Sequence, residues 1–161
     1  PEMTIFLNPI ANSYERLGRN EAPAFVSWSH KNRSQLVRIP AAHGDRFRME
    51  LRSPDPAVNP YIAFALIINA GLDGISKGLT LQPPVDADLY TADEAVTNNL
   101  TPIPSNMYKA IELAKSSSFI RDTIGEEILS KYLALKQEEA DEFSKAGDKE
   151  AFFRKRYFSK L

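Results

Sequence analysis

Cysteine is absent from the 161 residues of this chain. Disulfide bonds, thiolate metal sites and cysteine nucleophiles are therefore excluded, and the composition is compatible with a reducing compartment. Long apolar runs are also missing, since the longest, residues 61–70, is far shorter than the roughly 20 residues that a membrane-spanning helix needs. The first residues lack the basic segment and apolar core of a signal peptide. We therefore expect a cytoplasmic protein with no membrane partner.

Histidine is scarce, and a phosphate-binding glycine loop is missing. His30 and His43 each stand alone in a predicted turn, without a third ligand at a recognisable spacing, so we expect both to be surface residues. No G-x-x-x-x-G-K-[ST] sequence occurs. Any binding of phosphate must therefore depend on arginine side chains and a metal ion.

The net charge is −1, but the charged side chains are unevenly distributed along the sequence. Residues 1–52 contain eight Lys and Arg side chains against five Asp and Glu, and the remaining residues are acidic overall. Nearly all the basic side chains of the first part are arginines, whose forked guanidinium groups suit carboxylates and phosphates. This surplus of positive charge is too small to favour nucleic acid, so we expect no nucleic-acid partner.

Residues 46–52, RFRMELR, alternate between charged and apolar side chains. In a β-strand this alternation puts one set on each face, and the charged face would carry Arg46, Arg48, Glu50 and Arg52. The charged face has two interpretations: a solvated face of a half-buried strand, or a binding site for an anion. Arg33 and Arg38 lie close enough in sequence to join such a site, and Mg²⁺ on Glu50 would bring phosphate with it.

The sequence predicts an α+β fold with short antiparallel strands at the N-terminal side and a helical C-terminal region. Strands are expected within residues 23–29, 36–41 and 46–53. Asn59 and Pro60 are typical of a helix start, and the apolar residues that follow predict a buried helix to about residue 77. Residues 79–104 have little periodicity and are expected to form a long ordered loop. Further helices are expected within residues 105–158.

Five segments, in this order and spacing, resemble the C-terminal part of the catalytic domain of type I glutamine synthetase: NPIANSYERL, NEAP, SHKNRSQLVRIP, RMELRSPDPAVNPY and AGLDGI. The resemblance continues more weakly through DADLY and LSKYLALKQEE. It implies that residues 1–161 are a C-terminal fragment of such a catalytic domain, and we expect the chain to be cut from a longer protein.

The resemblance implies an ATP-dependent glutamate–ammonia ligase that makes glutamine through γ-glutamyl phosphate, with ATP and Mg²⁺ (or Mn²⁺) as cofactors. Glutamate and ammonium would be the substrates, and the full-length parent would form a homo-oligomer. The family's roles would make Glu50 a metal ligand, and the other roles would be distributed as follows: glutamate on Arg16 and Arg52, the transferred phosphoryl group on Arg33, nucleotide phosphates on Arg38 and Arg48, and site closure by Glu21. Tyr90 falls where some bacterial enzymes are nucleotidylated.

Two departures from the family pattern leave the substrate open. The segment from Arg16 to Glu21 is one residue shorter than usual, and Lys31 replaces an arginine. A γ-glutamyl–amine (polyamine) ligase and a non-catalytic glutamine synthetase-like module therefore stay as alternatives. The family's other metal ligands precede the matched segments, so we expect the isolated chain to be inactive.

Overall fold

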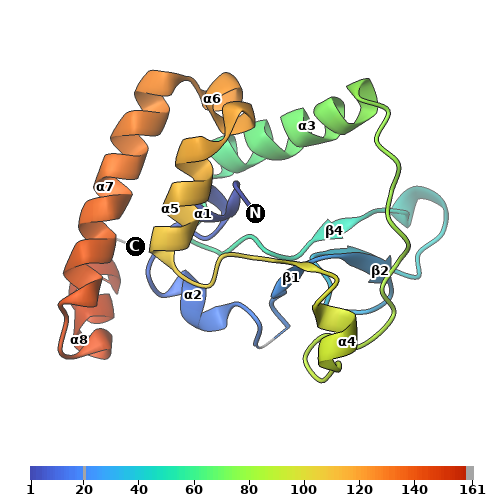
Figure 1. Cartoon of the computed structure of the whole chain (residues 1–161), viewed down its shortest axis with the longest axis horizontal. Helices are drawn as coiled ribbons and strands as arrows, with labels where there is room; N and C mark the ends of the chain where they lie inside the picture. The colour runs from blue at the N-terminus through green and yellow to red at the C-terminus, as the bar shows by residue number, and fades with distance from the viewer. Residues whose placement is uncertain (20, 159–161) are drawn as a thin grey trace.

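The computed structural model of the protein describes residues 1–19 and 21–158, with short strands in the first third and helices after them (Figure 1). Two short helices, α1 (Thr4–Leu7) and α2 (Ser13–Arg16), precede the strands. The strands of the first third are β1 (Phe25–Val26), β2 (Trp28–His30), β3 (Val37–Ile39) and β4 (Glu50–Leu51). The predicted α+β fold class is confirmed.

The strands form two small sheets. In the three-stranded sheet, β3 lies in the middle, parallel to β2 and antiparallel to β4. The antiparallel register places Arg38 directly opposite Glu50. β1 pairs antiparallel with β5 (Thr101–Pro102), which lies far along the chain. The set of strands is therefore mixed, with one parallel pairing among the three.

The third predicted strand is much shorter than expected. Residues Gly44–Arg46 form a 3-10 turn, η1, and only Glu50–Leu51 pair with β3. Phe47 and Met49 consequently do not belong to a buried strand face, and their side chains are 70% and 67% exposed. The prediction of one strand over residues 46–53 was wrong for its first half, because alternation alone does not show where a pairing partner ends.

The segment 79–104 contains two elements that its sequence pattern did not reveal. A short helix, α4 (Glu94–Thr97), and β5 interrupt the predicted loop. The first half of the segment runs beside β2, where Val85 N donates to Trp28 O at 2.9 Å and Trp28 Nε1 donates to Gln82 O at 2.7 Å. This segment therefore covers the β2 side of the small sheet.

Helix α3 (Pro60–Ser76) begins where the sequence predicts. The Asn59 side chain accepts hydrogen bonds from the N–H groups of Tyr61 and Ile62, and Pro60 takes the first helical position. Ala63 and Leu66 are buried, but the opposite face is open to solvent. The expectation of a helix buried on all sides is therefore wrong for this chain, although the composition of α3 is largely apolar.

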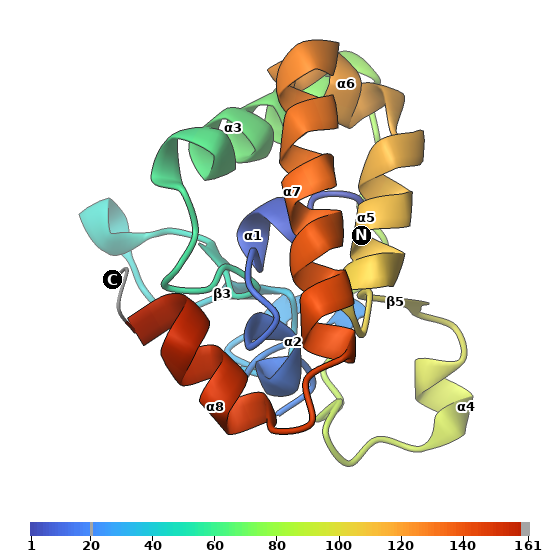
Figure 2. The ribbon, with the colours of Figure 1, turned by 90° about the vertical axis from the view of Figure 1, so that its left-hand side faces the viewer.

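The remaining helices build the core. They are α5 (Met107–Ser116), α6 (Ser118–Ile124), α7 (Glu126–Ser144), α8 (Lys149–Phe153) and the π-helical turn η2 (Arg154–Phe158). Gly125, at a φ of 82°, permits the sharp turn between α6 and α7. Figure 2 shows α7 running across α1 and alongside α5. The core cluster includes Ile5, Phe6, Leu66, Met107, Ile111, Ile120, Leu129 and Leu133.

A buried carboxylate joins the two ends of the described chain. Glu139, only 5% exposed, accepts hydrogen bonds from Tyr157 Oη at 2.6 Å and from Ala11 N at 3.2 Å. Lys136 Nζ pairs with its other oxygen at 3.0 Å. A buried charge that is paired and hydrogen-bonded in this way fixes α7, η2 and the loop before α2 relative to one another.

Replacing Leu66 by alanine tests the packing of α3. Leu66 is fully buried in the core, so Leu66→Ala is expected to lower the free energy of unfolding by about 2–5 kcal/mol. Ile68→Ala, on the exposed face of the same helix, is expected to change it by less than about 0.5 kcal/mol. Urea unfolding followed by circular dichroism measures both, and equal losses would contradict this packing.

Candidate functional site

Glu50 is the centre of a group of arginine side chains on the three-stranded sheet. Arg38 Nη1 donates to Glu50 Oε2 at 2.7 Å, and Arg48 Nη2 donates to Oε1 at 2.8 Å. Arg52, two residues along the chain from Glu50, brings Nη1 to 3.8 Å from Oε2. Three guanidinium groups thus surround one carboxylate; Arg48 and Arg52 come from the predicted charged face, whereas Arg46 of that face lies in η1.

Arg52 connects this group to a second carboxylate. Its Nη2 donates to the backbone oxygen of Glu21 at 2.9 Å and lies 3.8 Å from Glu21 Oε2. Its Nε donates to Arg33 O at 3.0 Å, while Arg33 Nη1 donates to Glu21 Oε1 at 3.1 Å. We call these six residues the arginine cluster: Glu21, Arg33, Arg38, Arg48, Glu50 and Arg52.

The turn around Asn32 places Arg33 in the cluster. Asn32 Oδ1 accepts from Ser34 N at 2.9 Å, and its Nδ2 donates to the backbone oxygens of Asp86 and Ala87. This side-chain turn, typical of asparagine, leaves Arg33 projecting from the loop towards Glu21. Sequence reasoning noted the turn but missed that segment 79–104 holds it in place.

Glu21 and Lys31 both have left-handed backbone conformations, with φ of 64° and 67°. Residues other than glycine, asparagine and aspartate rarely adopt this region, which costs roughly 1–3 kcal/mol. Tyr90 Oη donates to Ala22 O at 3.3 Å, directly after Glu21. Partial burial raises the pKa of the Tyr90 hydroxyl, so this group stays protonated and able to donate. The backbone at Glu21 is thus strained, and the next residue, Ala22, is held by the segment 79–104.

Arg16 lies apart from the arginine cluster in its contacts. Its Nη2 donates to Asn8 Oδ1 at 3.1 Å and to the backbone oxygen of Ser53, the residue after Arg52. Its Nε is buried without a partner among the described residues. A hollow beside it is lined by Arg16 together with Ile10, Asn12, Glu15 and Asp55–Ala57. Arg16 therefore keeps a free donor, and its expected contact with glutamate remains a prediction.

The electrostatics of the cluster favour a charged Glu50. The hydrogen bond from Arg38, followed by that from Arg48, lowers the pKa of the Glu50 carboxyl against the opposing effect of burial. Arg46 and Arg48 line a hollow next to the cluster, together with Pro40–His43. The Arg46 side chain has no hydrogen bond or ion pair with the described residues, so positive charge on this side is available to an anion.

A divalent cation does not fit the described residues by themselves. Among residues 1–19 and 21–158, no three His, Cys, Asp or Glu side chains gather as a metal site. Glu50 offers one carboxylate, and both of its oxygens are engaged by arginines. A complete Mg²⁺ site needs further oxygen ligands from elsewhere. The guanidinium groups, by contrast, fit phosphate and carboxylate without added protein ligands.

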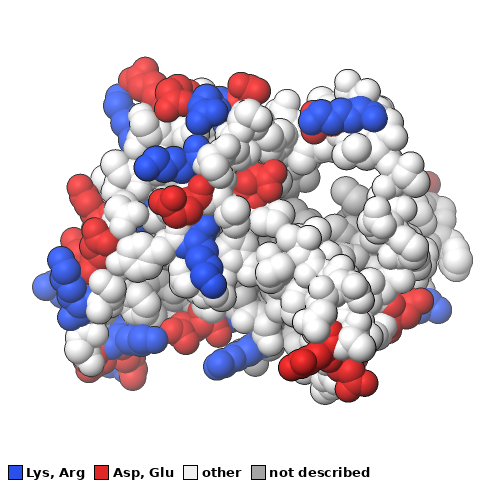
Figure 3. All heavy atoms as spheres, viewed as in Figure 1, with Lys and Arg blue, Asp and Glu red and all other residues white. Residues whose placement is uncertain are grey.

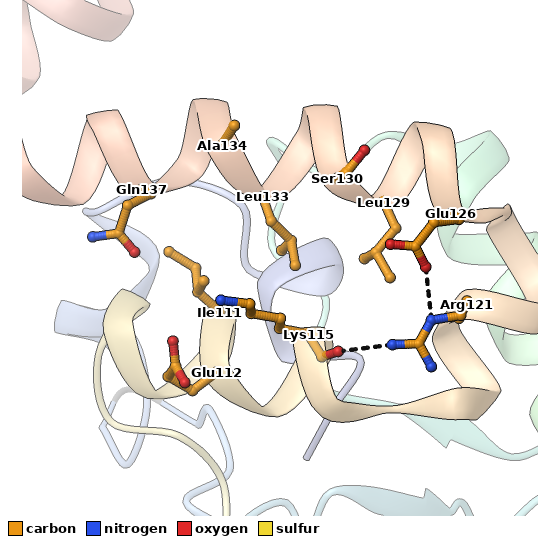
Figure 4. Close-up of a pocket in the computed structure, with 10 residues that line it drawn as sticks. All are labelled: Ile111, Glu112, Lys115, Arg121, Glu126, Leu129, Ser130, Leu133, Ala134 and Gln137. Carbon is orange, nitrogen blue, oxygen red and sulfur yellow. Dashed lines mark hydrogen bonds and ion pairs between the residues drawn. The ribbon is translucent and has the colours of Figure 1, made fainter.

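Other surface features carry no predicted site residue. A groove between α5 and α7 is lined by Ile111, Leu129, Leu133 and polar side chains, and Arg121 in its wall is held by Glu126 at 2.7 Å (Figure 4). His30 packs edge-on against Trp28, and His43 lines the hollow beside Arg48. In the part of the chain that the structure describes, no helix is long and apolar enough to cross a membrane.

The titration of Glu50 predicts a pH-dependent contribution to stability. Because its pKa is lowered in the folded protein, its stabilising effect is present above the ordinary value of 4.5 and disappears as the pH falls through the lowered value. The loss of stability caused by Glu50→Gln should therefore be larger at neutral pH than at an acidic pH below the lowered pKa of Glu50. Urea unfolding at a series of pH values measures it.

Glu127→Gln is the matched control for this experiment. Glu127 pairs with Lys131 on α7, but its side chain is 82% exposed, and exposed pairs contribute little. A Glu50→Gln effect that stayed constant across the pH series would contradict the arrangement around Glu50.

Comparisons with known proteins show the family of the chain. The family model described as "Glutamine synthetase, catalytic domain" matches residues 1–154. The chain is 42% identical over 145 residues to the glutamine synthetase of Methanosarcina mazei, covering 88% of this chain and 32% of that protein. It is also 42% identical over 140 residues to that of Thermotoga maritima, with 85% and 32% covered. The chain thus spans about a third of the length of these relatives.

Solved structures show the same fold. The structure titled "GmaS/ADP complex-Conformation 1" superposes with a TM-score of 0.76 at 26% identity, over 98% of this chain and 36% of that one. A GmaS structure without ligand gives the same TM-score at 29% identity, over 98% and 35%. Together, the ordered motifs, the shared fold and the match over nearly the whole chain place it in the glutamine synthetase family, as the C-terminal part of the catalytic domain.

Proposed function

We propose that this chain supplies the arginine cluster of an ATP-dependent ligase that joins glutamate and ammonium to make glutamine through γ-glutamyl phosphate. One observation carries the proposal: Arg52, expected to bind glutamate, contacts both Glu21 and Glu50 and so joins the residues expected to bind phosphate and metal in a single connected group, with Arg16 outside it. The relationship to glutamine synthetases supports it. The whole protein would work in the cytoplasm as a homo-oligomer.

The cluster suits the charge that develops in phosphoryl transfer. Arg38 and Arg48 would bind nucleotide phosphates, and the solved GmaS complex contains ADP. Arg33 would stabilise negative charge on the phosphoryl group as it passes to glutamate. A divalent ion, Mg²⁺ or Mn²⁺, would shield the ATP phosphates, with Glu50 as one of its ligands and the others lying outside the described residues.

Glutamate would lie between Arg52 and Arg16. Ser53 directly follows Arg52 in the chain, and its backbone oxygen accepts a hydrogen bond from the Arg16 guanidinium group. Glu21 would close over the reacting groups, exclude water from the acyl phosphate and accept a proton from ammonium. Opening this arrangement requires Glu21 to exchange its contacts with Arg33 and Arg52 for contacts with substrate.

Two alternatives remain for the whole protein. A γ-glutamyl–amine (polyamine) ligase is favoured by the shortened segment before Glu21 and by the left-handed conformation of Glu21 itself. A non-catalytic module would follow if the whole protein lacks the family's other metal ligands. The isolated chain would be inactive under either the leading proposal or these alternatives, because Glu50 alone does not hold the metal.

Enzyme assays on the complete product of the gene that encodes this chain test the proposal. We expect glutamate-dependent release of phosphate from ATP and formation of glutamine with ammonium. Arg33→Ala and Arg52→Ala should each lower kcat by about 10²–10³, the usual effect of removing a charge-stabilising donor. Arg121→Ala, at the distant α5–α7 groove, is the matched control and should leave the rate unchanged.

The acceptor used in the assay separates the alternatives. Faster turnover with methylamine or a polyamine than with ammonium would replace the leading proposal by the amine ligase. No turnover with any acceptor, in a folded and complete gene product, would leave the non-catalytic module. Full activity in Arg33→Ala and Arg52→Ala would contradict the role given to the arginine cluster.

A further inference from the structure

The last described turn of the chain, η2, contacts the segment that leads into α2. Ala11 N donates to Tyr157 Oη at 3.0 Å and also to Glu139 Oε1 at 3.2 Å. Tyr157 Oη in turn donates to Glu139 Oε1 at 2.6 Å. All three residues are buried. We call Ala11, Glu139 and Tyr157 the Tyr157 anchor.

The hydrogen bonds of the anchor have a fixed direction. Burial, followed by the hydrogen bond to Glu139, raises the pKa of the Tyr157 hydroxyl, so this group stays protonated and donates at neutral pH. Lys136 Nζ occupies the other carboxylate oxygen, Oε2, at 3.0 Å. Glu139 Oε1 is therefore left to accept from Tyr157 and Ala11.

Helix α2 depends on contacts from outside itself. It is a single turn, Ser13–Arg16, and Asn12 at its start makes no side-chain cap. So short a helix is not stable in water by itself. Two contacts set its direction: the anchor at Ala11, just before the helix, and Tyr14, which packs against the core with its hydroxyl buried.

A surface ion pair joins the same elements. Lys149 Nζ, at the start of α8, lies 3.0 Å from Glu15 Oε1, and the two side chains are 62% and 49% exposed. Figure 2 shows α8 close to α2, and basic and acidic side chains mix over this part of the surface (Figure 3, lower left). Because an exposed pair contributes little, the buried anchor is the contact that fixes α2.

Arg16, the last residue of α2, is the side chain expected to bind glutamate with Arg52. Its Nη2 is held by Asn8 and Ser53, while its Nε is buried without a partner among the described residues. A buried donor without a partner is rare, and use by a ligand accounts for it. The position of this donor depends on the backbone of α2, and a misplacement of about 1 Å in a binding site can cost roughly 100-fold in rate.

We propose that Tyr157 and Glu139 are positioning residues for glutamate: through Ala11 they fix α2, and thereby the place of Arg16. This role rests on the proposed function, in which Arg16 binds the substrate. Neither Tyr157 nor Glu139 would touch glutamate itself. Tyr157 lies beyond residue 154, where the match to the family model ends, so the resemblance does not predict this contact.

Tyr157→Phe in the complete gene product tests the proposal. It removes only a hydroxyl, since the ring keeps its contacts with Phe152 and Phe153. We expect the KM for glutamate to rise about 3–10-fold, the size of effect that one lost hydrogen bond produces. The KM for ATP should stay within about twofold, because Arg38 and Arg48 are held by Glu50 and not by α2. Steady-state kinetics with each substrate varied in turn measures both.

Tyr132→Phe is the matched control. It also removes a tyrosine hydroxyl of the helical core, but this hydroxyl donates to Ile5 O in α1 at 3.0 Å and not to the segment before α2. Both KM values of the control should stay within about twofold of those of the unchanged protein. An equal rise in the glutamate KM of both variants would overturn the proposal. So would an equal rise for glutamate and ATP in Tyr157→Phe.

Hydrogen exchange measures the effect on α2 without any substrate. Tyr157→Phe should speed the exchange of amides in residues 11–16, whereas Tyr132→Phe should leave them unchanged. Unchanged exchange in Tyr157→Phe would overturn the proposal.

The assays also separate this inference from the proposed function. A lack of glutamine formation by the unchanged, folded protein would defeat the proposed function and this role together. Normal turnover by that protein, with an unchanged glutamate KM in Tyr157→Phe, would defeat the positioning role alone.

Discussion

The pairing of two carboxylates with four guanidinium groups is the interaction on which the candidate site depends. Arg38 faces Glu50 across an antiparallel ladder, and Arg52 extends the contact to Glu21. Without the two acids, the positive charges gathered by β3, β4 and the adjoining loops would repel one another. With them, the cluster is stable before any ligand arrives, and a ligand that enters must offer phosphate or carboxylate oxygens in exchange.

The backbone around the cluster contains little regular secondary structure, and side-chain hydrogen bonds hold its loops in place. β4 has two residues and β3 three, so ladder hydrogen bonds alone hold little of the site. Asn32 fixes one loop against the segment 79–104, and Tyr90 from the same segment holds the turn after Glu21. A stretch that its sequence marks as a loop therefore orients two members of the site.

The sequence predicts those features of the structure that depend on residues close together in the chain. The alternation around Glu50 and Arg52 correctly put them on one side of a strand, and Asn59 with Pro60 fixed the start of α3. Three features were missed: the late start of β4, the elements α4 and β5, and the exposure of α3. Each depends on a partner distant in sequence. The apolar composition of α3 does not show which of its faces the rest of the chain buries.

The contact between Ala11 and Glu139 spans 128 positions of the sequence. During synthesis on the ribosome, α1 emerges long before α5 and α7, the helices that pack against it, have been translated. Ile5 and Phe6 are almost fully buried in the folded chain, and they must stay exposed until Tyr132 of α7 has been made. Closure of this core is thus postponed until α7 has been translated, when distant segments meet at a considerable entropic cost.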